Sequence, residues 1–156
     1  MRGWQKKGFR EWLNNDLKGI FSVVTGGGKT IFGIYCLSYL FENDLTDSVF
    51  IVVPTKTLQD QWVSNILIST NCLKEEISLN RNKLSKINIL TNISTQKIPF
   101  DKLNLRYSIV LDECHRYGTS NNLNFMTYPY VSKIGLTATL ERKYDTGVND
   151  ILVPNI

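Results

Sequence analysis

Thr25-Gly26-Gly27-Gly28-Lys29-Thr30 is the most informative run of this sequence, because an apolar run precedes it and a helical pattern follows it. Glycines let a backbone curl so that successive N–H groups point inward at phosphate oxygens. The N-terminus of the following helix adds a positive dipole potential. Lys29 can reach the β- and γ-phosphates of a nucleotide, and the Thr30 hydroxyl can ligate Mg²⁺. The stretch therefore predicts a phosphate-binding loop between a strand and a helix.

This loop departs from the strict phosphate-loop pattern at one position. The strict form, G-x-x-x-x-G-K-[ST], needs glycine at position 23, where this chain has Val23. The alternative interpretation is a glycine-rich turn that happens to precede Lys29. The strand and helix on either side favour the phosphate loop.

Outside the loop, short runs rich in Val and Ile alternate with longer helical patterns. This alternation is typical of a parallel sheet with crossover helices, so we expect an α/β fold with helices on both faces of a mainly parallel sheet. The expected strands are Ile20–Val24, Val49–Val53, Ile87–Leu90, Ser108–Leu111 and Lys133–Leu136. The expected helices are Gly3–Asn14, Thr30–Phe41 and one whose buried face carries Leu58, Trp62, Ile66 and Ser69.

One predicted helix is unusually apolar, and one long stretch of the chain is polar. The helix Thr30–Phe41 is apolar nearly all round, so we expect it to be buried on most sides. The stretch Asn71–Lys86 is polar, and its pattern does not assign it to a helix or a strand. Trp4 and Trp12 lie on the apolar face of the first helix and are expected in the core rather than against a base.

The composition is that of one ordinary globular domain. The 156 residues are 42% apolar and 21% charged, which excludes a disordered or membrane chain. The apolar stretch Ile31–Phe41 is too short to cross a bilayer, and we expect no secretory signal and no membrane partner. Cys36, Cys72 and Cys114 are odd in number and widely spaced, so we expect packing roles and a reducing, cytoplasmic location. The net charge of +4 favours an anionic partner only weakly, and a solvated basic surface explains it equally well.

A later apolar run ends in an acidic pair, Ile109-Val110-Leu111-Asp112-Glu113. A carboxylate at the tip of a parallel strand lies at the carboxyl edge of the sheet, beside a phosphate loop. Asp112 is then a candidate to hold Mg²⁺ through its water shell, and Glu113 to orient and deprotonate a water molecule. The alternative is a solvated start of a loop, which the phosphate loop in the same domain disfavours.

At these residues the sequence resembles the superfamily 2 helicases and translocases. Asp112-Glu113-Cys114-His115 resembles their DEAD/DEAH-type motif II, with Cys at the variable place. Arg2-Gly3-Trp4-Gln5 resembles their adenine-reading element. The resemblance implies a RecA-like lobe that binds ATP and Mg²⁺, with Arg2 and Gln5 on the adenine side. For Gln5, the alternative is an exposed glutamine on a surface helix.

Three further segments carry the same resemblance. The run Val53-Pro54-Thr55-Lys56-Thr57-Leu58-Gln59-Asp60-Gln61-Trp62 resembles motif Ia of one branch, which holds repair translocases, phage recombination helicases and motor subunits of restriction enzymes. Thr91-Asn92-Ile93-Ser94 is a looser match to motif Ib. The run Gly135-Leu136-Thr137-Ala138-Thr139-Leu140-Glu141-Arg142 resembles motif III. These motifs, in the order of the family, extend from residue 2 to residue 142.

The resemblance implies roles for the residues of these segments. His115 would couple the nucleotide site to Thr137, Ala138 and Thr139 of motif III, the alternatives being an ordinary histidine and ordinary strand-end threonines. Contacts to nucleic-acid phosphates would come from Thr55, Lys56, Thr91 and Ser94, and the branch implies DNA rather than RNA. The basic cluster Lys6, Lys7 and Arg10 fits a solvated helix face better than a binding site.

The same family implies a partner lobe. We expect residues 1–142 to form the ATP-binding lobe and residues 143–156 to begin a linker towards a second RecA-like lobe, in cis or in trans. That lobe would supply an arginine finger, which is worth roughly a thousand-fold or more in hydrolysis rate. We therefore expect this polypeptide to be part of a longer protein, and to bind ATP weakly and hydrolyse it poorly alone. Two alternatives are a nucleotide-controlled binding module without hydrolysis and a small-molecule kinase, the latter disfavoured by the motif order.

Overall fold

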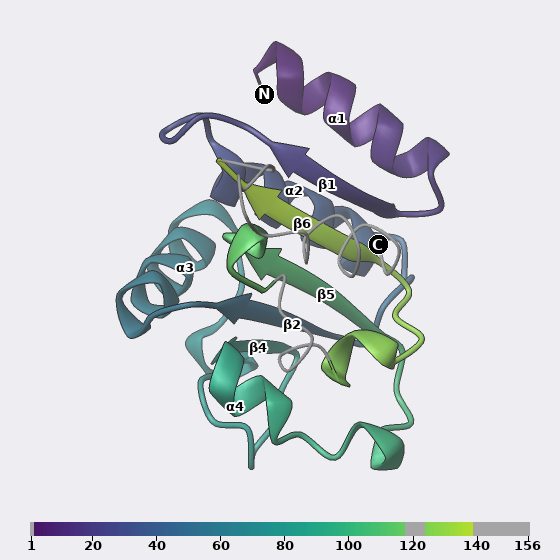
Figure 1. Cartoon of the computed structure of the whole chain (residues 1–156), viewed down its shortest axis with the longest axis vertical. Coiled ribbons are helices and arrows are strands. Elements are labelled where there is room, and N and C mark those ends of the chain that lie inside the picture. Colours follow the sequence, from purple (N-terminus) through teal and green to yellow (C-terminus); the bar gives the residue numbers. More distant parts are fainter. Residues whose placement is uncertain (1, 118–123, 139–156) are drawn as a thin grey trace.

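The computed structural model of the chain, which describes residues 2–117 and 124–138, contains a six-stranded sheet in the order β1-β6-β5-β2-β4-β3 (Figure 1). Each neighbouring pair of strands is parallel. The strands are β1 Lys18–Ser22, β2 Ser48–Val53, β3 Ile77–Ser78, β4 Ile87–Thr91, β5 Tyr107–Asp112 and β6 Lys133–Thr137. The predicted α/β fold with a parallel sheet is confirmed.

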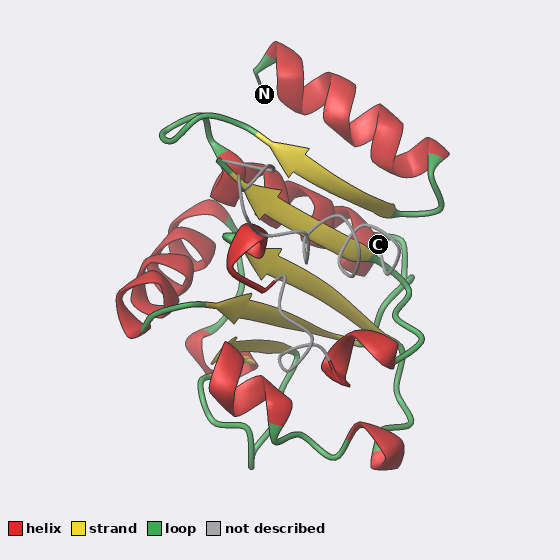
Figure 2. Cartoon of the chain, in the orientation of Figure 1, coloured by secondary structure: helices red, strands yellow, loops and turns green. Residues whose placement is uncertain are grey.

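Helices connect and cover these strands (Figure 2). The α-helices are α1 Gly3–Asn14, α2 Lys29–Glu42, α3 Lys56–Ser69 and α4 Asn92–Gln96. The 3₁₀ helices are η1 Lys74–Glu76, η2 Phe100–Lys102, η3 Cys114–Tyr117 and η5 Asn124–Thr127. Helices α1, α2 and α3 are the three that the sequence predicted. The sequence did not predict α4, β3 or the 3₁₀ helices, which are too short for a hydrophobic period to become visible.

The sheet is buried on both faces, and β2 shows how its side chains divide. Val49, Ile51 and Val53 belong to one apolar cluster, which also contains the buried faces of α2 and α3. Phe50 and Val52 belong to a second cluster on the opposite face, with buried residues of β4, β5 and η5. Successive side chains of a strand point to opposite faces, so the apolar run of β2 fits a strand in the middle of a covered sheet.

One detail differs from the predictions. Strand β1 ends at Ser22, so the predicted strand Ile20–Val24 begins and ends too late. Val24 is 75% exposed and lies in the turn of the loop, where its carbonyl accepts the Gly27 N–H at 2.9 Å. Helix α2 is buried on most sides, as predicted, but Ile31 and Tyr35 are exposed. They lie four residues apart and share the face turned away from the sheet.

The strand order places three loops side by side. Strands β1, β6 and β5 are consecutive neighbours, with Ser22 opposite Thr137 and Asp112 opposite Leu136. Helix α1 lies beside β1 at this side of the sheet (Figure 1). Because all strands are parallel, the segments that follow β1, β5 and β6 emerge at one edge. Of the helices in the described residues, none has both the length and the apolarity to cross a membrane.

Candidate functional site

The glycine-rich loop between β1 and α2 has a backbone that requires glycine. Gly28 precedes the first residue of α2 with φ of 88°, which is a left-handed conformation that side chains disfavour. A Cβ added to Gly27 would lie 2.4 Å from Cγ1 of Val23. Thr25 and Gly26 are exposed, and Lys29 and Thr30 form the first turn of α2. The predicted phosphate-loop residues thus form one turn at a helix N-terminus.

Three side chains from the start of the chain hold the carbonyl oxygens of this loop. Nη1 of Arg2 donates to Gly26 O at 3.2 Å. The indole N–H of Trp4 donates to Gly27 O at 2.9 Å, and Nε2 of Gln5 donates to Gly28 O at 3.0 Å. These three hydrogen bonds hold the loop against the start of α1. Trp4 packs against the core as predicted, but its hydrogen bond to the loop was not foreseen.

Gln5 is buried, so the alternative of an exposed helix glutamine is wrong. Only 4% of the residue's surface is exposed. Its Oε1 accepts the Arg2 N–H at 2.7 Å, while Nε2 reaches Gly28. An amide has two hydrogens and two acceptor lone pairs, so one of each remains after these bonds.

Asp112 ends β5 as a buried carboxylate, which makes the alternative of a solvated loop start wrong. Its Oδ2 accepts the indole N–H of Trp62 at 2.7 Å, and its Oδ1 accepts the Glu113 N–H at 2.9 Å. Burial raises the pKa of Asp112, the nearby Glu113 carboxylate adds to that rise, and the Trp62 hydrogen bond opposes it. The carboxylate is therefore held in one orientation by two donors.

Glu113 lies between two nitrogen groups. Its Oε1 is 3.7 Å from Nζ of Lys29, and its Oε2 is 3.4 Å from Nδ1 of His115. The backbone of Glu113 is left-handed, with φ of 52°, which is strained for a residue with a side chain. The sharp turn directs the carboxylate of Glu113 towards the first turn of α2.

The segments resembling motifs II and III meet through side chains. Nδ1 of His115 lies 2.8 Å from Oγ1 of Thr137, the buried last residue of β6. Ala138 follows and is half-buried, whereas Thr139 lies outside the described residues. Nδ1 of His115 thus lies close to both the Glu113 carboxylate and the Thr137 hydroxyl.

The predicted nucleic-acid contacts lie at the ends of two neighbouring strands. Thr55 precedes α3, and its hydroxyl accepts the Leu58 N–H at 3.3 Å. Thr91, at the end of β4, accepts the Ser94 N–H at 3.4 Å in the same way. Lys56 is exposed beside Thr55. Because β2 and β4 are paired, with Val53 opposite Thr91, these residues share one edge of the sheet.

The donor set suits a metal that arrives with a nucleotide. Within residues 2–117 and 124–138, no three His, Cys, Asp or Glu side chains gather into a metal site. The candidate ligands are instead one carboxylate, Asp112, and one hydroxyl, Thr30. Mg²⁺ usually keeps several waters and binds through one or two protein groups together with phosphates. The residues present therefore fit Mg²⁺ bound to ATP.

Sequence reasoning missed the role of Trp62. The tryptophan was predicted only as part of the buried face of α3, where it lies with 1% exposure. A buried indole N–H needs an acceptor, and the fully buried Asp112 is one. That requirement was a usable signal, but the pairing itself spans 50 positions and depends on how α3 packs against β5.

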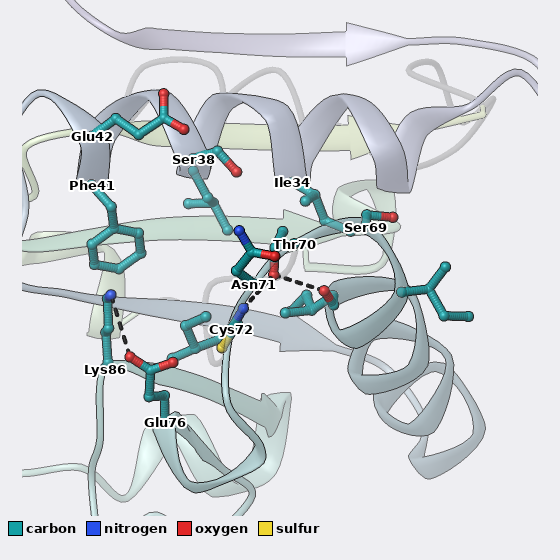
Figure 3. Close-up of a pocket in the computed structure, with 14 residues that line it drawn as sticks. Ile34, Ser38, Phe41, Glu42, Ser69, Thr70, Asn71, Cys72, Glu76 and Lys86 are labelled. Carbon is teal, nitrogen blue, oxygen red and sulfur yellow. Dashed lines mark hydrogen bonds and ion pairs between the residues drawn. The ribbon is translucent and has the colours of Figure 1, made fainter.

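A cavity of about 500 Å³ lies elsewhere, along the second half of α2 and the end of α3 (Figure 3). It is lined by none of the predicted site residues. Lys86 in its wall pairs with Glu76 at 3.5 Å, and its ammonium lies 4.7 Å from the centre of the Phe41 ring. We assign no function to this cavity.

Comparison with known proteins agrees with this geometry. Residues 1–142 match the family described as "Type III restriction enzyme, res subunit". The chain belongs to this family. A zebrafish protein, the SWI/SNF-related matrix-associated actin-dependent regulator of chromatin subfamily A containing DEAD/H box 1A, is 31% identical over 83% of this chain and 16% of its own length. An uncharacterized protein of Mycobacterium leprae, ML1624, is 33% identical over 40% of this chain and 11% of its own length.

Solved structures share the fold of the chain. The helicase domain of Hef from Pyrococcus furiosus matches with a TM-score of 0.80 and 20% identity, over 99% of this chain and 36% of that one. The UvsW helicase from bacteriophage T4 matches with a TM-score of 0.79 and 19% identity, over 95% of this chain and 56% of that one. The chain therefore spans only part of the proteins that it matches. It is a first RecA-like lobe of the superfamily 2 helicase type, as the sequence predicted.

Proposed function

We propose that the chain is the ATP-binding motor lobe of a DNA helicase or translocase, and that it hydrolyses MgATP when joined to a second lobe. The observation that carries this proposal is the 3.7 Å approach of Lys29 Nζ to Glu113 Oε1. A lysine at the N-terminus of α2 and the carboxylate that follows β5 thereby meet at one point of the sheet edge. Phosphoryl transfer to water uses a cation to neutralise phosphate charge and a residue that positions the water, and these two side chains are candidates for those parts.

Each residue of the site has a distinct part in this proposal. The backbone N–H groups of residues 25–30 cradle the phosphates, and Lys29 neutralises the charge between β and γ. Thr30 and Asp112 hold Mg²⁺, which supplies charge neutralisation at the phosphates when it is bound. Glu113 orients a water molecule and accepts its proton. Arg2 and Gln5 bind the adenine side, since Gln5 retains one donor and one acceptor.

The second part of the proposal concerns coupling. His115 contacts both Glu113 and Thr137, so a structural change at the bound nucleotide is transmitted to the end of β6. Ala138 and Thr139 extend this route along the motif III segment. A hydrogen-bonded contact with two arrangements is the physical device that such coupling needs.

We further propose that DNA lies across the ends of β2 and β4. The hydroxyls and backbone amides around Thr55, Lys56, Thr91 and Ser94 suit contacts to phosphates that carry no sequence information. Two structurally similar proteins were solved with DNA or a mimic of it: the type ISP restriction-modification enzyme LlaGI, and a Sulfolobus solfataricus SWI2/SNF2 ATPase core. Their likeness to this chain supports DNA as the partner.

In this proposal residues 1–142 form the lobe, and residues 143–156, of which none is described, begin a linker. Hydrolysis by the chain alone is slow because the arginine finger belongs to the second RecA-like lobe. The competing function is a nucleotide-controlled binding module. DNA-stimulated turnover, measured after a second lobe is supplied in cis or in trans, would exclude that module, and complete absence of turnover would favour it.

The deciding experiment is calorimetry of ATP and GTP binding in Mg²⁺. The chain should bind ATP in preference to GTP, and Lys29→Ala should lose binding. Lys7→Ala is the matched control, because it removes an exposed lysine whose ion pair is with Glu11 on the same helix. Equal loss in both variants, or no effect of Lys29→Ala, would overturn the phosphate-loop assignment. Equal binding of ATP and GTP would overturn the Gln5 assignment alone.

A further inference from the structure

Trp62 connects α3 to the acidic pair. Its indole N–H donates to Oδ2 of Asp112 at 2.7 Å, with both residues buried. Of the two carboxylate oxygens of Asp112, Oδ1 is fixed by the following backbone N–H and Oδ2 by this indole. Rotation of the carboxylate about its last bond would break both hydrogen bonds.

The surrounding structure holds the Trp62 ring in place. Gln59, one turn earlier in α3, donates to Ile89 O of β4 at 2.6 Å, so the helix is fixed to the sheet beside the tryptophan. On the other side, α2 carries Gly33 where the ring passes. A Cβ on Gly33 would lie 2.9 Å from Cη2 of Trp62. The ring therefore occupies a slot that exists only because position 33 lacks a side chain.

We propose that Trp62 is a positioning residue that orients the Asp112 carboxylate towards a nucleotide-bound divalent cation. This inference rests on the proposed function, in which Asp112 holds Mg²⁺. A carboxylate that must present an oxygen to a cation or its waters works best when its rotamer is locked before the cation arrives. The indole N–H supplies that lock, and it leaves further lone pairs of both oxygens for the metal's waters.

A second tryptophan supplies the comparison with a purely structural role. Trp12 is also buried, and its N–H donates to Oγ of Ser132 at 3.2 Å, away from the acidic pair. Each Trp→Phe substitution removes one buried indole N–H and leaves a similar void. Only Trp62→Phe also frees the carboxylate of Asp112.

The test measures Mn²⁺ affinity by electron paramagnetic resonance in the presence of saturating ADP. We expect Trp62→Phe to weaken Mn²⁺ binding about 10-fold, and Trp12→Phe to leave it unchanged. ADP affinity without metal should stay the same in both variants, which shows that the phosphate loop is intact. Trp62→His should restore most of the Mn²⁺ affinity, because the imidazole ring overlays the five-membered ring of indole and offers an N–H at the same place.

The possible outcomes distinguish failure of the proposed function from failure of the positioning role of Trp62. If the unmodified chain with ADP binds no Mn²⁺, the proposed function fails, and the positioning role fails with it. If the unmodified chain binds Mn²⁺ and Trp62→Phe binds it as tightly as Trp12→Phe does, only the positioning role is overturned. Equal losses of metal-free ADP binding and Mn²⁺ binding in Trp62→Phe would also overturn it, because they indicate a structural defect.

Discussion

The side-chain amide of Gln5 donates to the carbonyl oxygen of Gly28 at 3.0 Å, across 23 positions of the sequence. Gly28 directly precedes α2, so this bond ties the first helix of the chain to the glycine-rich loop. Arg2 and Trp4 make equivalent bonds to the two preceding glycines. Any change at the start of α1 is therefore expected to alter the loop as well as the adenine side.

Gln5→Ala should weaken binding of both nucleotides, and of ATP more than GTP. Loss of the bond to Gly28 loosens the loop for either base, at about 1 kcal/mol for one hydrogen bond. Loss of the remaining donor and acceptor affects adenine alone. Calorimetry with both nucleotides measures the two effects, and Asn88→Ala is the control, since the buried amide of Asn88 donates to Val49 O and Ser85 O. An equal decline for ATP and GTP would show that Gln5 serves the loop and does not read the base.

Glu113→Gly should be more stable than Glu113→Ala in the absence of nucleotide. The left-handed backbone of Glu113 costs about 1 kcal/mol or more for a residue with a Cβ, and glycine removes that cost. Glu113→Ala is the matched control, because it removes the same carboxylate but keeps the Cβ. Urea unfolding should give a higher free energy of unfolding for the glycine variant than for the alanine variant. The reverse order would mean that φ of 52° at this position carries no strain.

The parts of the site that sequence reasoning identified are those formed by contiguous residues. The glycine loop and the acidic pair each follow a strand, and the parallel sheet brings such segments to one edge. The strand order β1-β6-β5 then makes them neighbours. Resemblance to a family predicts that His115 couples the nucleotide site to Thr137; the two side chains are 2.8 Å apart, and the coupling itself stays a prediction.

The missed parts depend on tertiary packing. The bonds from Trp4 to Gly27 and from Trp62 to Asp112 join segments 23 and 50 positions apart. No local pattern specifies which buried acceptor an indole finds. Strand β3 has only two residues and exists through its pairing with β4. The polar stretch around it therefore carried no period that could have predicted it.

The Arg106–Asp47 pair should make stability depend on pH in the acid range. Hydrogen bonds from the Arg106 side chain lower the pKa of Asp47 below its ordinary value. A lowered pKa stabilises the fold above the unfolded-state pKa of about 4, and that contribution is lost as pH falls through the folded value. Arg106→Gln should therefore reduce the midpoint of thermal unfolding at neutral pH, with a difference that shrinks below a pH of about 4.

The control for this effect is Lys7→Gln. Lys7 and Glu11 form an exposed pair at 3.9 Å on α1, and such pairs contribute little to stability. The variant should change the midpoint of thermal unfolding little at any pH. A constant difference between the unmodified chain and Arg106→Gln down to the lowest pH would contradict the assignment of the pKa shift to Arg106.

Gly33→Ala should be destabilising in the unmodified chain and tolerated when Trp62 is replaced. The new Cβ would meet Cη2 of Trp62 at 2.9 Å and side-chain carbon of Leu136 at 3.3 Å, and such overpacking costs about 1–3 kcal/mol. In Trp62→Phe the shorter ring leaves the slot open. In that variant, alanine at position 33 is expected to increase the free energy of unfolding by up to about 1 kcal/mol relative to glycine, because alanine is the better helix former.

A double-mutant cycle on the free energy of unfolding tests this coupling. The single variants, Gly33→Ala and Trp62→Phe, should each destabilise the chain, and the double variant should be more stable than the sum of their effects requires. Additive effects would show that the position of the Trp62 ring does not depend on the missing side chain at Gly33. Because the space at Gly33 keeps the indole against Asp112, a strong coupling energy would tie the packing of α2 on α3 to the geometry of the Asp112 carboxylate.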